Sequence, residues 1–217
     1  SSGVTSTLAT PARQLPAPDA ECVPLLADIE QAAVRARGLT QQLLTFAKGG
    51  APVKQRASLR EILTESSLFV ARGSSVACAF EIDEHLAPVE VDTAQISQVF
   101  QNLVINAVQA MPTGGTVTVR AENVALDDPQ ILPPGTYVRI TIADTGMGIP
   151  EAHLTRIFDP YFTTKQVGSG LGLTTALSIV MRHGGRLEVQ SHIGHGTACI
   201  VHLPALTSDH SIDVHVP

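Results

Sequence analysis

Apolar residues recur at helical spacing in several stretches of the 217-residue chain. The first stretch, from Leu25 to Phe46, alternates steps of four and three residues over three heptads, which predicts a helix that packs against a partner helix. A core helix of a single domain is the alternative interpretation. The other stretches predict helices over 58–72, 92–111, 151–157 and 172–182.

Alternation of apolar and other residues marks a second kind of element. It predicts strands over 76–82, 117–119, 137–143, 186–191 and 197–203. Acidic, proline and glycine residues over 124–135 predict a loop. Because helices and strands are mixed from residue 58 onward without strict βαβ alternation, we expect an α/β (α+β) fold. This fold is a two-layer sandwich, in which helices cover one face of a sheet.

Three positions predict how helices begin or end. Ser58 with Glu61, and Asp92 with Gln95, have the spacing of N-terminal capping boxes. His183 stands directly before two glycines at the end of the last helix. We expect it to be a cation there, because the helix dipole favours positive charge at a C-terminus.

Composition excludes several classes of function. The chain has 20 acidic and 14 basic residues, a net charge of -6, and 4% aromatic residues, so we expect no nucleic-acid partner. No apolar run approaches the length of a membrane span, and no secretory signal is present, so we expect no direct membrane contact. The three cysteines form no CxxC pattern, which favours reduced thiols in a cytoplasmic protein and makes zinc improbable.

Two asparagines suggest a metal ligand. Asn102 and Asn106 are four residues apart, so they share one face of the predicted helix. A neutral amide oxygen can bind Mg²⁺ without adding negative charge near phosphates. Two ordinary surface amides are the alternative.

A carboxylate followed by glycines comes directly after a predicted strand, in the segment Asp144-Thr145-Gly146-Met147-Gly148. Such a carboxylate suits hydrogen bonding to a ligand amine, and the glycines permit close backbone approach. A plain turn is the alternative. The triplet Asp144-Thr145-Gly146 also occurs in aspartic proteases, but this chain has one copy of it and lacks an all-β pattern.

Two further clusters follow one another, Phe158 to Lys165 and Gly168 to Leu173. Glycines at a helix start expose backbone N–H groups, which with the helix dipole form an anion cradle. Lys165 can add a point charge. The spacing fits neither the Walker A pattern nor GxGxxG, and a flexible turn is the alternative. Together the clusters supply the parts of a nucleoside-triphosphate site.

In this order the clusters resemble the N, G1, F and G2 boxes of the catalytic domain of bacterial sensor histidine kinases, and residues 194–197 resemble a last glycine box. The resemblance covers about 58–204 and implies the Bergerat-type sandwich shared with gyrase, heat-shock chaperone and mismatch-repair ATPases. The stretch from Asn106 to Pro112 is similar to the subgroup of nitrogen-regulation kinases.

The resemblance implies that ATP and Mg²⁺ bind here. Asn106 would hold the metal, with Asn102 and Lys165 beside it in the catalytic group. Asp144 would accept from the adenine amino group, helped through water by Thr197, and residues 159–170 would form the ATP lid. Many members carry a basic residue where this chain has Gln109. The expected nucleotide-binding residues are Asn102, Asn106, Gln109, Ala110, Asp144, Gly146, Gly148, Ile149, Phe158, Thr164, Lys165, Gly168, Ser169, Gly170, Leu171, Gly172, Leu173 and Thr197.

The phospho-accepting histidine of the family has no counterpart, because no histidine precedes His85. We therefore expect a truncated hairpin and a fragment that is inactive in autophosphorylation. The expected organisation is a lead-in over 1–20, the second hairpin helix over 21–50, a linker over 51–57, the catalytic domain over 58–204 and a polar tail over 205–217.

The implied activity is transfer of the ATP γ-phosphoryl group to a histidine, for relay to a response-regulator receiver domain. The implied assembly is a homodimer through the hairpin, in the cytoplasm or as the cytoplasmic part of a membrane-anchored protein. Hydrolytic relatives carry a glutamate base where Asn102 stands, which favours transfer over hydrolysis. An ATP-hydrolysing relative and a nucleotide-sensing dimerisation module are the alternatives.

Overall fold

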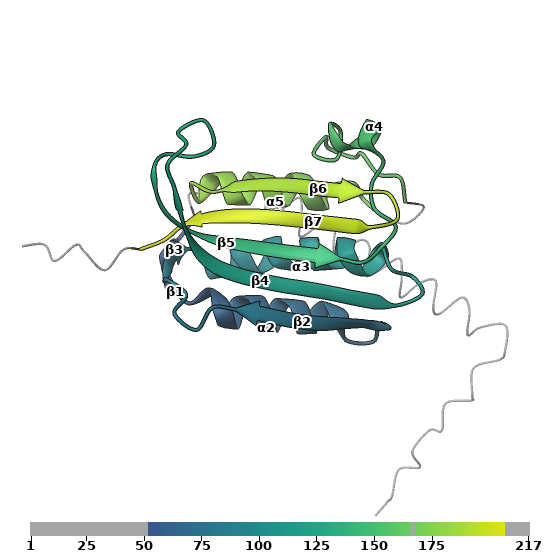
Figure 1. Cartoon of the computed structure of the whole chain (residues 1–217), viewed down its shortest axis with the longest axis horizontal. Helices are drawn as coiled ribbons and strands as arrows, with labels where there is room; N and C mark the ends of the chain where they lie inside the picture. Colours follow the sequence, from purple (N-terminus) through teal and green to yellow (C-terminus); the bar gives the residue numbers. More distant parts are fainter. Residues whose placement is uncertain (1–51, 166–167, 207–217) are drawn as a thin grey trace, which may run out of the picture. The chain divides into compact units, whose positions relative to one another are not determined.

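A five-stranded mixed sheet organises the part of the chain that the computed structural model describes, residues 52–165 and 168–206 (Figure 1). Only β2 and β4 are parallel, and the other neighbours are antiparallel. The strands lie in the order β2 (Val76–Ile82), β4 (Gly115–Leu126), β5 (Gly135–Asp144), β7 (Gly196–Pro204) and β6 (Arg186–His192).

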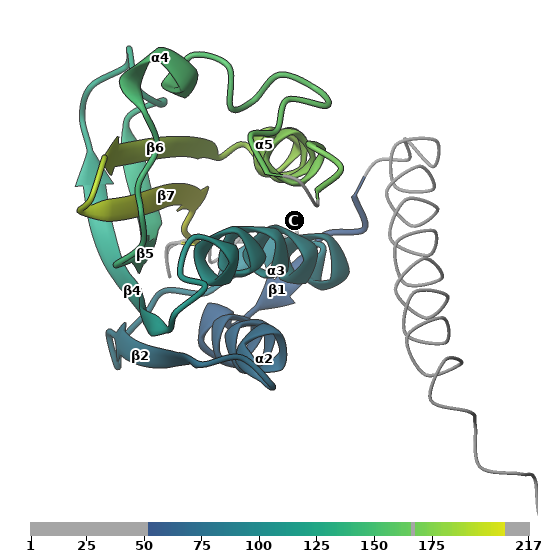
Figure 2. The ribbon, with the colours of Figure 1, turned by 90° about the vertical axis from the view of Figure 1, so that its right-hand side faces the viewer.

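Three helices cover one face of this sheet, as the end-on view in Figure 2 shows. They are α2 (Leu59–Ala71), α3 (Thr93–Gln109) and α5 (Gly172–Arg182), with α3 packed between the other two. Their apolar stripes and the inward residues of the strands form one buried core, in which Phe100 of α3 is fully buried. The predicted two-layer sandwich is confirmed.

Four short or extended elements differ from the expected pattern. Strand β4 continues to Leu126, so the loop between β4 and β5 is shorter than expected. The fourth helix, α4 (Glu151–Leu154), is a single turn. Two three-residue strands, β1 (Gln55–Ala57) and β3 (Val89–Val91), pair antiparallel. Strand β1 lies within the predicted linker and was missed because three residues carry too little alternation to predict a strand.

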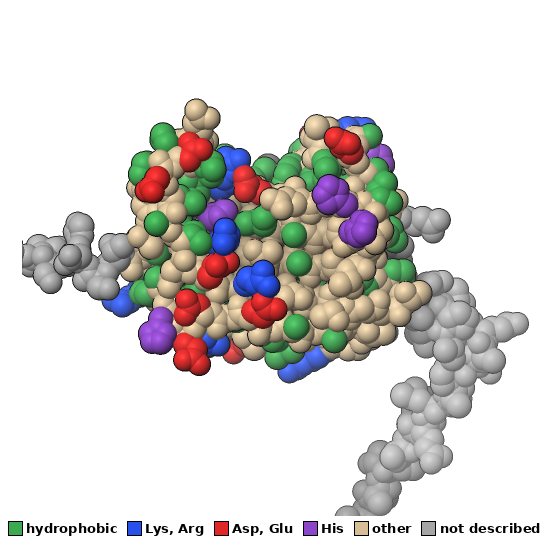
Figure 3. All heavy atoms as spheres, in the orientation of Figure 1, with side chains coloured by type: hydrophobic (Ala, Val, Ile, Leu, Met, Phe, Trp, Pro, Cys, Tyr) green, Lys and Arg blue, Asp and Glu red, His purple; other side chains and the backbone are tan. Residues whose placement is uncertain are grey.

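The opposite face of the sheet has no helix over it in the described residues and carries charged pairs (Figures 1 and 3). Arg120 lies opposite Glu81 on the neighbouring strand, with 2.6 Å between Nη2 and Oε2. Arg139 pairs in the same way with Glu122, at 2.9 Å. Because these charged residues lie on the face away from the core, polar and apolar residues alternate along the strands. Each exposed ion pair contributes at most about 1 kcal/mol to stability.

The capping predictions are only half right. The Ser58 side chain accepts no capping hydrogen bond, so its predicted capping box is wrong. Asp92 does cap α3, because its Oδ1 accepts from the Gln95 backbone N–H at 3.1 Å. The backbone N–H of Asp92 donates instead to Nε2 of His183, at 3.0 Å.

His183 is a buried neutral side chain, and the prediction of a cation is wrong. Only 3% of the residue is exposed. Its Nδ1 donates to the Ile179 carbonyl oxygen at 2.8 Å, while its Nε2 accepts from Asp92. Burial lowers the pKa of His183 from its ordinary value. With one nitrogen donating and the other accepting, the imidazole is uncharged.

Within the described ranges, no helix is both long and apolar enough to cross a membrane. Cys78 and Cys199 are both free thiols. Burial raises the pKa of Cys199 to about 12, so this thiol is protonated at neutral pH.

Candidate functional site

The C-terminal half of α3 meets the beginning of α5. Nδ2 of Asn102 donates to the Gly172 carbonyl oxygen at 3.2 Å. A Cβ atom at Gly172 would lie 4.0 Å from the Asn106 amide nitrogen. The predicted metal ligand Asn106 and the predicted anion cradle, 62 or more residues apart in sequence, are therefore neighbours in the fold.

Asp144 ends β5 with a carboxylate that is only partly satisfied. Its Oδ1 accepts from the backbone N–H groups of Gly146 at 2.8 Å and Thr197 at 3.3 Å. Its Oδ2 accepts no hydrogen bond within residues 52–165 and 168–206. Partial burial raises the pKa of Asp144, and the two backbone donors oppose this shift. The oxygen Oδ2 is thus available to a ligand donor.

A buried serine fixes the turn after Asp144. Oγ of Ser191 accepts from the Ile149 backbone N–H at 2.8 Å and donates to the Gly196 carbonyl oxygen at 2.9 Å. It also lies 2.9 Å from Oγ1 of Thr197. Sequence reasoning missed Ser191, and the signal was its polar side chain at a core-facing position of β6. Ile149 and Thr197 are joined through this residue.

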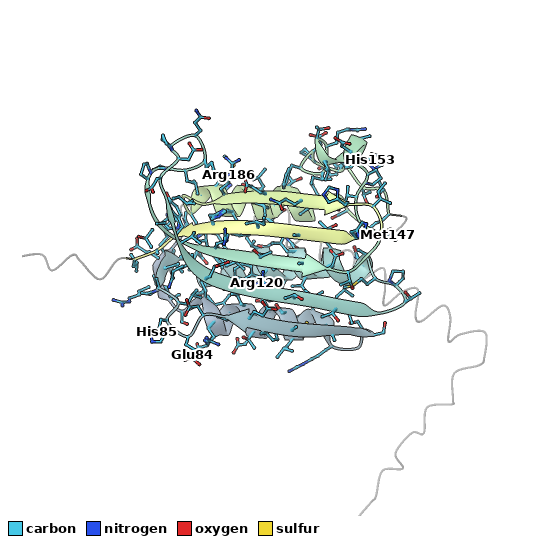
Figure 4. All side chains as sticks on the ribbon, in the orientation of Figure 1. Glu84, His85, Arg120, Met147, His153 and Arg186 are labelled. Atoms are coloured by element: carbon cyan, nitrogen blue, oxygen red, sulfur yellow. The ribbon has the colours of Figure 1, made fainter. Side chains whose placement is uncertain are left out.

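The glycines of the turn are required by close backbone contacts. Gly148 has a φ of +72°, and a Cβ there would lie 2.1 Å from the His192 carbonyl oxygen. A Cβ at Gly146 would lie 2.6 Å from the Ala110 carbonyl oxygen, at the end of α3. Figure 4 shows Met147 and His153 at this end of the sheet, with Arg186 at the opposite end. Glycine therefore lets three segments meet here.

The predicted lid is held near both of its ends. The Tyr161 backbone N–H donates to the Gly170 carbonyl oxygen at 3.1 Å, and Tyr161 has a left-handed φ of 66°. Gly170 has the same φ, and a Cβ there would lie 2.4 Å from the Tyr161 carbonyl carbon. The Arg156 guanidinium lies 4.5 Å from the centre of the Phe162 ring. These contacts hold residues that precede and follow Lys165 in the sequence.

Lys165 reaches across to α3. Its Nζ donates to Oε1 of Gln109 at 2.8 Å and lies 3.5 Å from Oδ1 of Asn106. The residue is exposed overall, but its ammonium loses enough hydration to lower the pKa of Lys165, while the Asp144 carboxylate opposes this. Two amide oxygens of α3, those of Gln109 and Asn106, therefore lie next to a cation, the Lys165 ammonium.

Other predicted site residues have supporting contacts. The Phe158 carbonyl oxygen accepts from Oγ1 of Thr174 at 3.0 Å, and its side chain packs against the core, as does that of Leu173. Oγ of Ser169 accepts from the Leu171 backbone N–H at 3.4 Å. Gly168 and Thr164 are exposed.

Comparison with known families agrees with this geometry. Residues 91–207 match the family described as histidine kinase-, DNA gyrase B-, and HSP90-like ATPase. The chain belongs to this ATPase family. It therefore carries an ATP-binding domain, and the family resemblance expected from the boxes is confirmed. The nitrogen-regulation subgroup stays a prediction.

Relatives of this ATPase domain are named as sensor kinases. The sensor kinase CckA of Brucella abortus is 36% identical over 88% of this chain, and the sensor histidine kinase ZraS of Salmonella typhi is 34% identical over 79%. The chain spans 21% and 36% of these two relatives. A solved structure of histidine kinase ThkA in complex with response regulator TrrA is 25% identical, with a TM-score of 0.67, over 91% of this chain and 55% of that one.

Proposed function

We propose that this domain is the catalytic part of a sensor histidine kinase, which binds Mg²⁺·ATP between α3, the Asp144 turn and the lid residues. The observation that carries the proposal is the meeting of three polar groups from separate segments. The amide oxygen of Asn106 lies 3.5 Å from the ammonium of Lys165, and this ammonium interacts electrostatically with the Asp144 carboxylate, which keeps one oxygen open within the described residues. The kinase names of the relatives support it.

The donors present fit a magnesium ion. Oδ1 of Asn106 faces the Lys165 ammonium at 3.5 Å, so this neutral oxygen is placed to bind a cation. Asn106 would hold the metal, with Asn102 beside it fixed to Gly172. Bound Mg²⁺ would neutralise phosphate charge and orient the triphosphate.

The remaining groups fit the two ends of the nucleotide. Oδ2 of Asp144 accepts a hydrogen bond from the adenine amino group, with Thr197 acting through water. The backbone N–H groups of Gly168, Gly170 and Gly172 are offered to phosphate near the start of α5, where the helix dipole is positive. The Leu171 N–H would exchange its 3.4 Å hydrogen bond to Ser169 for one to phosphate. The side chains of Gln109 and Thr164 and the backbone of Ala110 complete the proposed site.

Transfer to histidine is favoured over hydrolysis. A neutral imidazole nitrogen attacks the γ-phosphorus and forms a P–N bond, while the bond to the β–γ bridging oxygen breaks and ADP leaves. The imidazole needs no base, since its ordinary pKa is about 6.5. Asn102, which is bonded to Gly172, would lie beside the phosphates, and its amide cannot take a proton from water.

The acceptor and the partner belong to the same proposal. The heptad residues within 21–50, which lie outside the described residues, would form the second helix of a dimerising hairpin. The phosphoryl group would pass onward to a response-regulator receiver domain, as the solved complex of ThkA with TrrA suggests. We propose a cytoplasmic location for this domain.

The test combines binding with transfer. Isothermal titration of the whole chain with ATP and Mg²⁺ should give saturable heat. ATP at a hundred times its Kd should also stabilise the fold by about 2.7 kcal/mol. With γ-labelled ATP, label should pass to a supplied hairpin that carries the histidine. A chain that binds no ATP contradicts the proposal, and rapid phosphate release without the hairpin would indicate an ATPase instead.

A further inference from the structure

Gln109 joins α3 to the lid through a side-chain hydrogen bond. This residue is the last of α3, and its Oε1 accepts from Nζ of Lys165 at 2.8 Å across 56 positions of sequence. The second contact of the ammonium, to Oδ1 of Asn106, is longer, at 3.5 Å. Gln109 is therefore the main anchor of the Lys165 charge.

The chemistry of this anchor is unusual for a lysine partner. Both oxygens that hold the ammonium are neutral amides, and no ion pair of Lys165 occurs among the described residues. A carboxylate in the same place would neutralise the charge and repel a phosphate. A neutral amide fixes the ammonium and leaves its charge available to an anion.

The two anchors also differ in what ATP would do to them. If the metal takes Oδ1 of Asn106, Lys165 loses its longer contact and keeps the shorter one to Gln109. Gln109 is exposed on α3 and makes no other side-chain hydrogen bond within the described ranges. Holding Lys165 is thus the role that its contacts support.

We propose that Gln109 is a positioning residue that holds the Lys165 ammonium beside the triphosphate, so that a lid side chain supplies the phosphate charge while α3 supplies only neutral ligands. The inference rests on the proposed function and deepens it. Discrimination of ATP from adenosine depends on the Gln109–Lys165 pair, whereas recognition of the base does not.

The experiment compares Gln109→Met, which keeps the length of the side chain and removes its oxygen, with Lys165→Gln and the double variant. Affinities for Mg²⁺·ATP and for adenosine are measured by calorimetry on the whole chain. We expect Lys165→Gln to weaken ATP binding about tenfold and Gln109→Met about threefold to tenfold. Adenosine affinity should stay within about twofold of the unchanged chain.

The double variant separates positioning from an independent contact. Because Gln109 acts through Lys165, the double variant should bind ATP no more weakly than Lys165→Gln alone. Gln109→Glu should weaken ATP binding more than Gln109→Met, since it adds an ion pair and a repelling charge. Gln101→Met, a matched control on the same helix, should change neither affinity.

Three results would overturn the inference. They are unchanged ATP affinity in Gln109→Met, additive losses in the double variant, and an equal loss of adenosine binding. In each of these the unchanged chain still binds ATP, and the proposed function stands. Failure of the unchanged chain to bind ATP would overturn both.

Discussion

The pairing of α3 with α5 has two ends that use polar residues in opposite ways. At one end, the backbone N–H of Asp92 donates to His183, and the imidazole donates to Ile179. The Asp92 N–H and both ring nitrogens of His183 are thus satisfied within the protein. At the other end, Asn102 donates a hydrogen bond to Gly172. Among the described residues, however, Asp144 keeps one carboxylate oxygen open and the Lys165 ammonium contacts neutral amides.

This difference separates structural polar groups from functional ones. A buried polar group whose partners are complete contributes to stability, and removing it leaves those partners unsatisfied. A polar group with spare capacity can exchange a weak internal partner for a ligand. We therefore expect substitutions of polar side chains at the closed end to change stability and those of polar side chains at the open end to change binding.

The largest effect should come from the backbone of the open end. Gly148→Ala would place a Cβ 2.1 Å from the His192 carbonyl oxygen at a φ of +72°. We expect a loss on the order of 4 kcal/mol in the free energy of unfolding, with ATP binding lost as well. Urea denaturation measures it. The control is Gly194→Ala, at φ +77° with open space around it, which should cost about 1 kcal/mol. Equal losses would show that only φ matters.

At the closed end, His183→Ala should destabilise the chain by about 3 kcal/mol, because it leaves a cavity and removes the partners of Asp92 and Ile179. Calorimetry under conditions where the variant is folded should find ATP affinity within about twofold of the unchanged chain. The exposed His195→Ala is the matched control and should be neutral. A strong loss of ATP affinity would break the distinction between the two ends.

At the open end, Asn106→Ala should weaken Mg²⁺·ATP binding about tenfold and leave the free energy of unfolding within about 0.5 kcal/mol. The reason is that its only side-chain hydrogen bond in the described ranges is the 3.5 Å one to Lys165. With EDTA in place of Mg²⁺, the variant and the unchanged chain should bind ATP nearly equally. A difference that persists in EDTA would argue against Asn106 as the metal ligand.

The smallest effect is a dependence of stability on pH. Burial lowers the pKa of His183 in the folded chain, so the unfolded chain takes up a proton first as the pH falls below about 6.5. Stability should therefore decrease between pH 7.5 and 5.5. Burial lowers the pKa of His202 in the same direction. Denaturation of His183→Ala should show a shallower slope that retains the His202 part, and an unchanged slope would contradict this assignment.

The local sequence pattern was sufficient to predict features that depend on a single helix or strand. The spacing of Ile96, Val99 and Phe100 predicted the buried face of α3, and Asp92 was correctly expected to cap it. The same reasoning failed for the second half of that cap, since His183 replaces Gln95 as the partner of the Asp92 N–H. His183 lies 91 residues away, and no local rule can choose between two such partners.

The candidate site shows the same division. Its boxes were readable because glycines and amides at short spacings are local requirements of a ligand. Ser191 was not, because a serine in a strand has many possible partners. The contact of Gln109 with Lys165 could not be predicted either. The sequence shows only that a glutamine stands where many family members carry a basic residue, and not which residue it contacts.

The sequence by itself determined the class of fold, the order of the long elements and the family, because periodicity and short glycine patterns act within one element. Tertiary structure alone decided which polar groups have their hydrogen bonds satisfied within the protein and which stay available to a ligand. That choice depends on packing between residues 53 to 91 positions apart, where a few tenths of an ångström decide whether a polar group forms a hydrogen bond or stays open to a ligand.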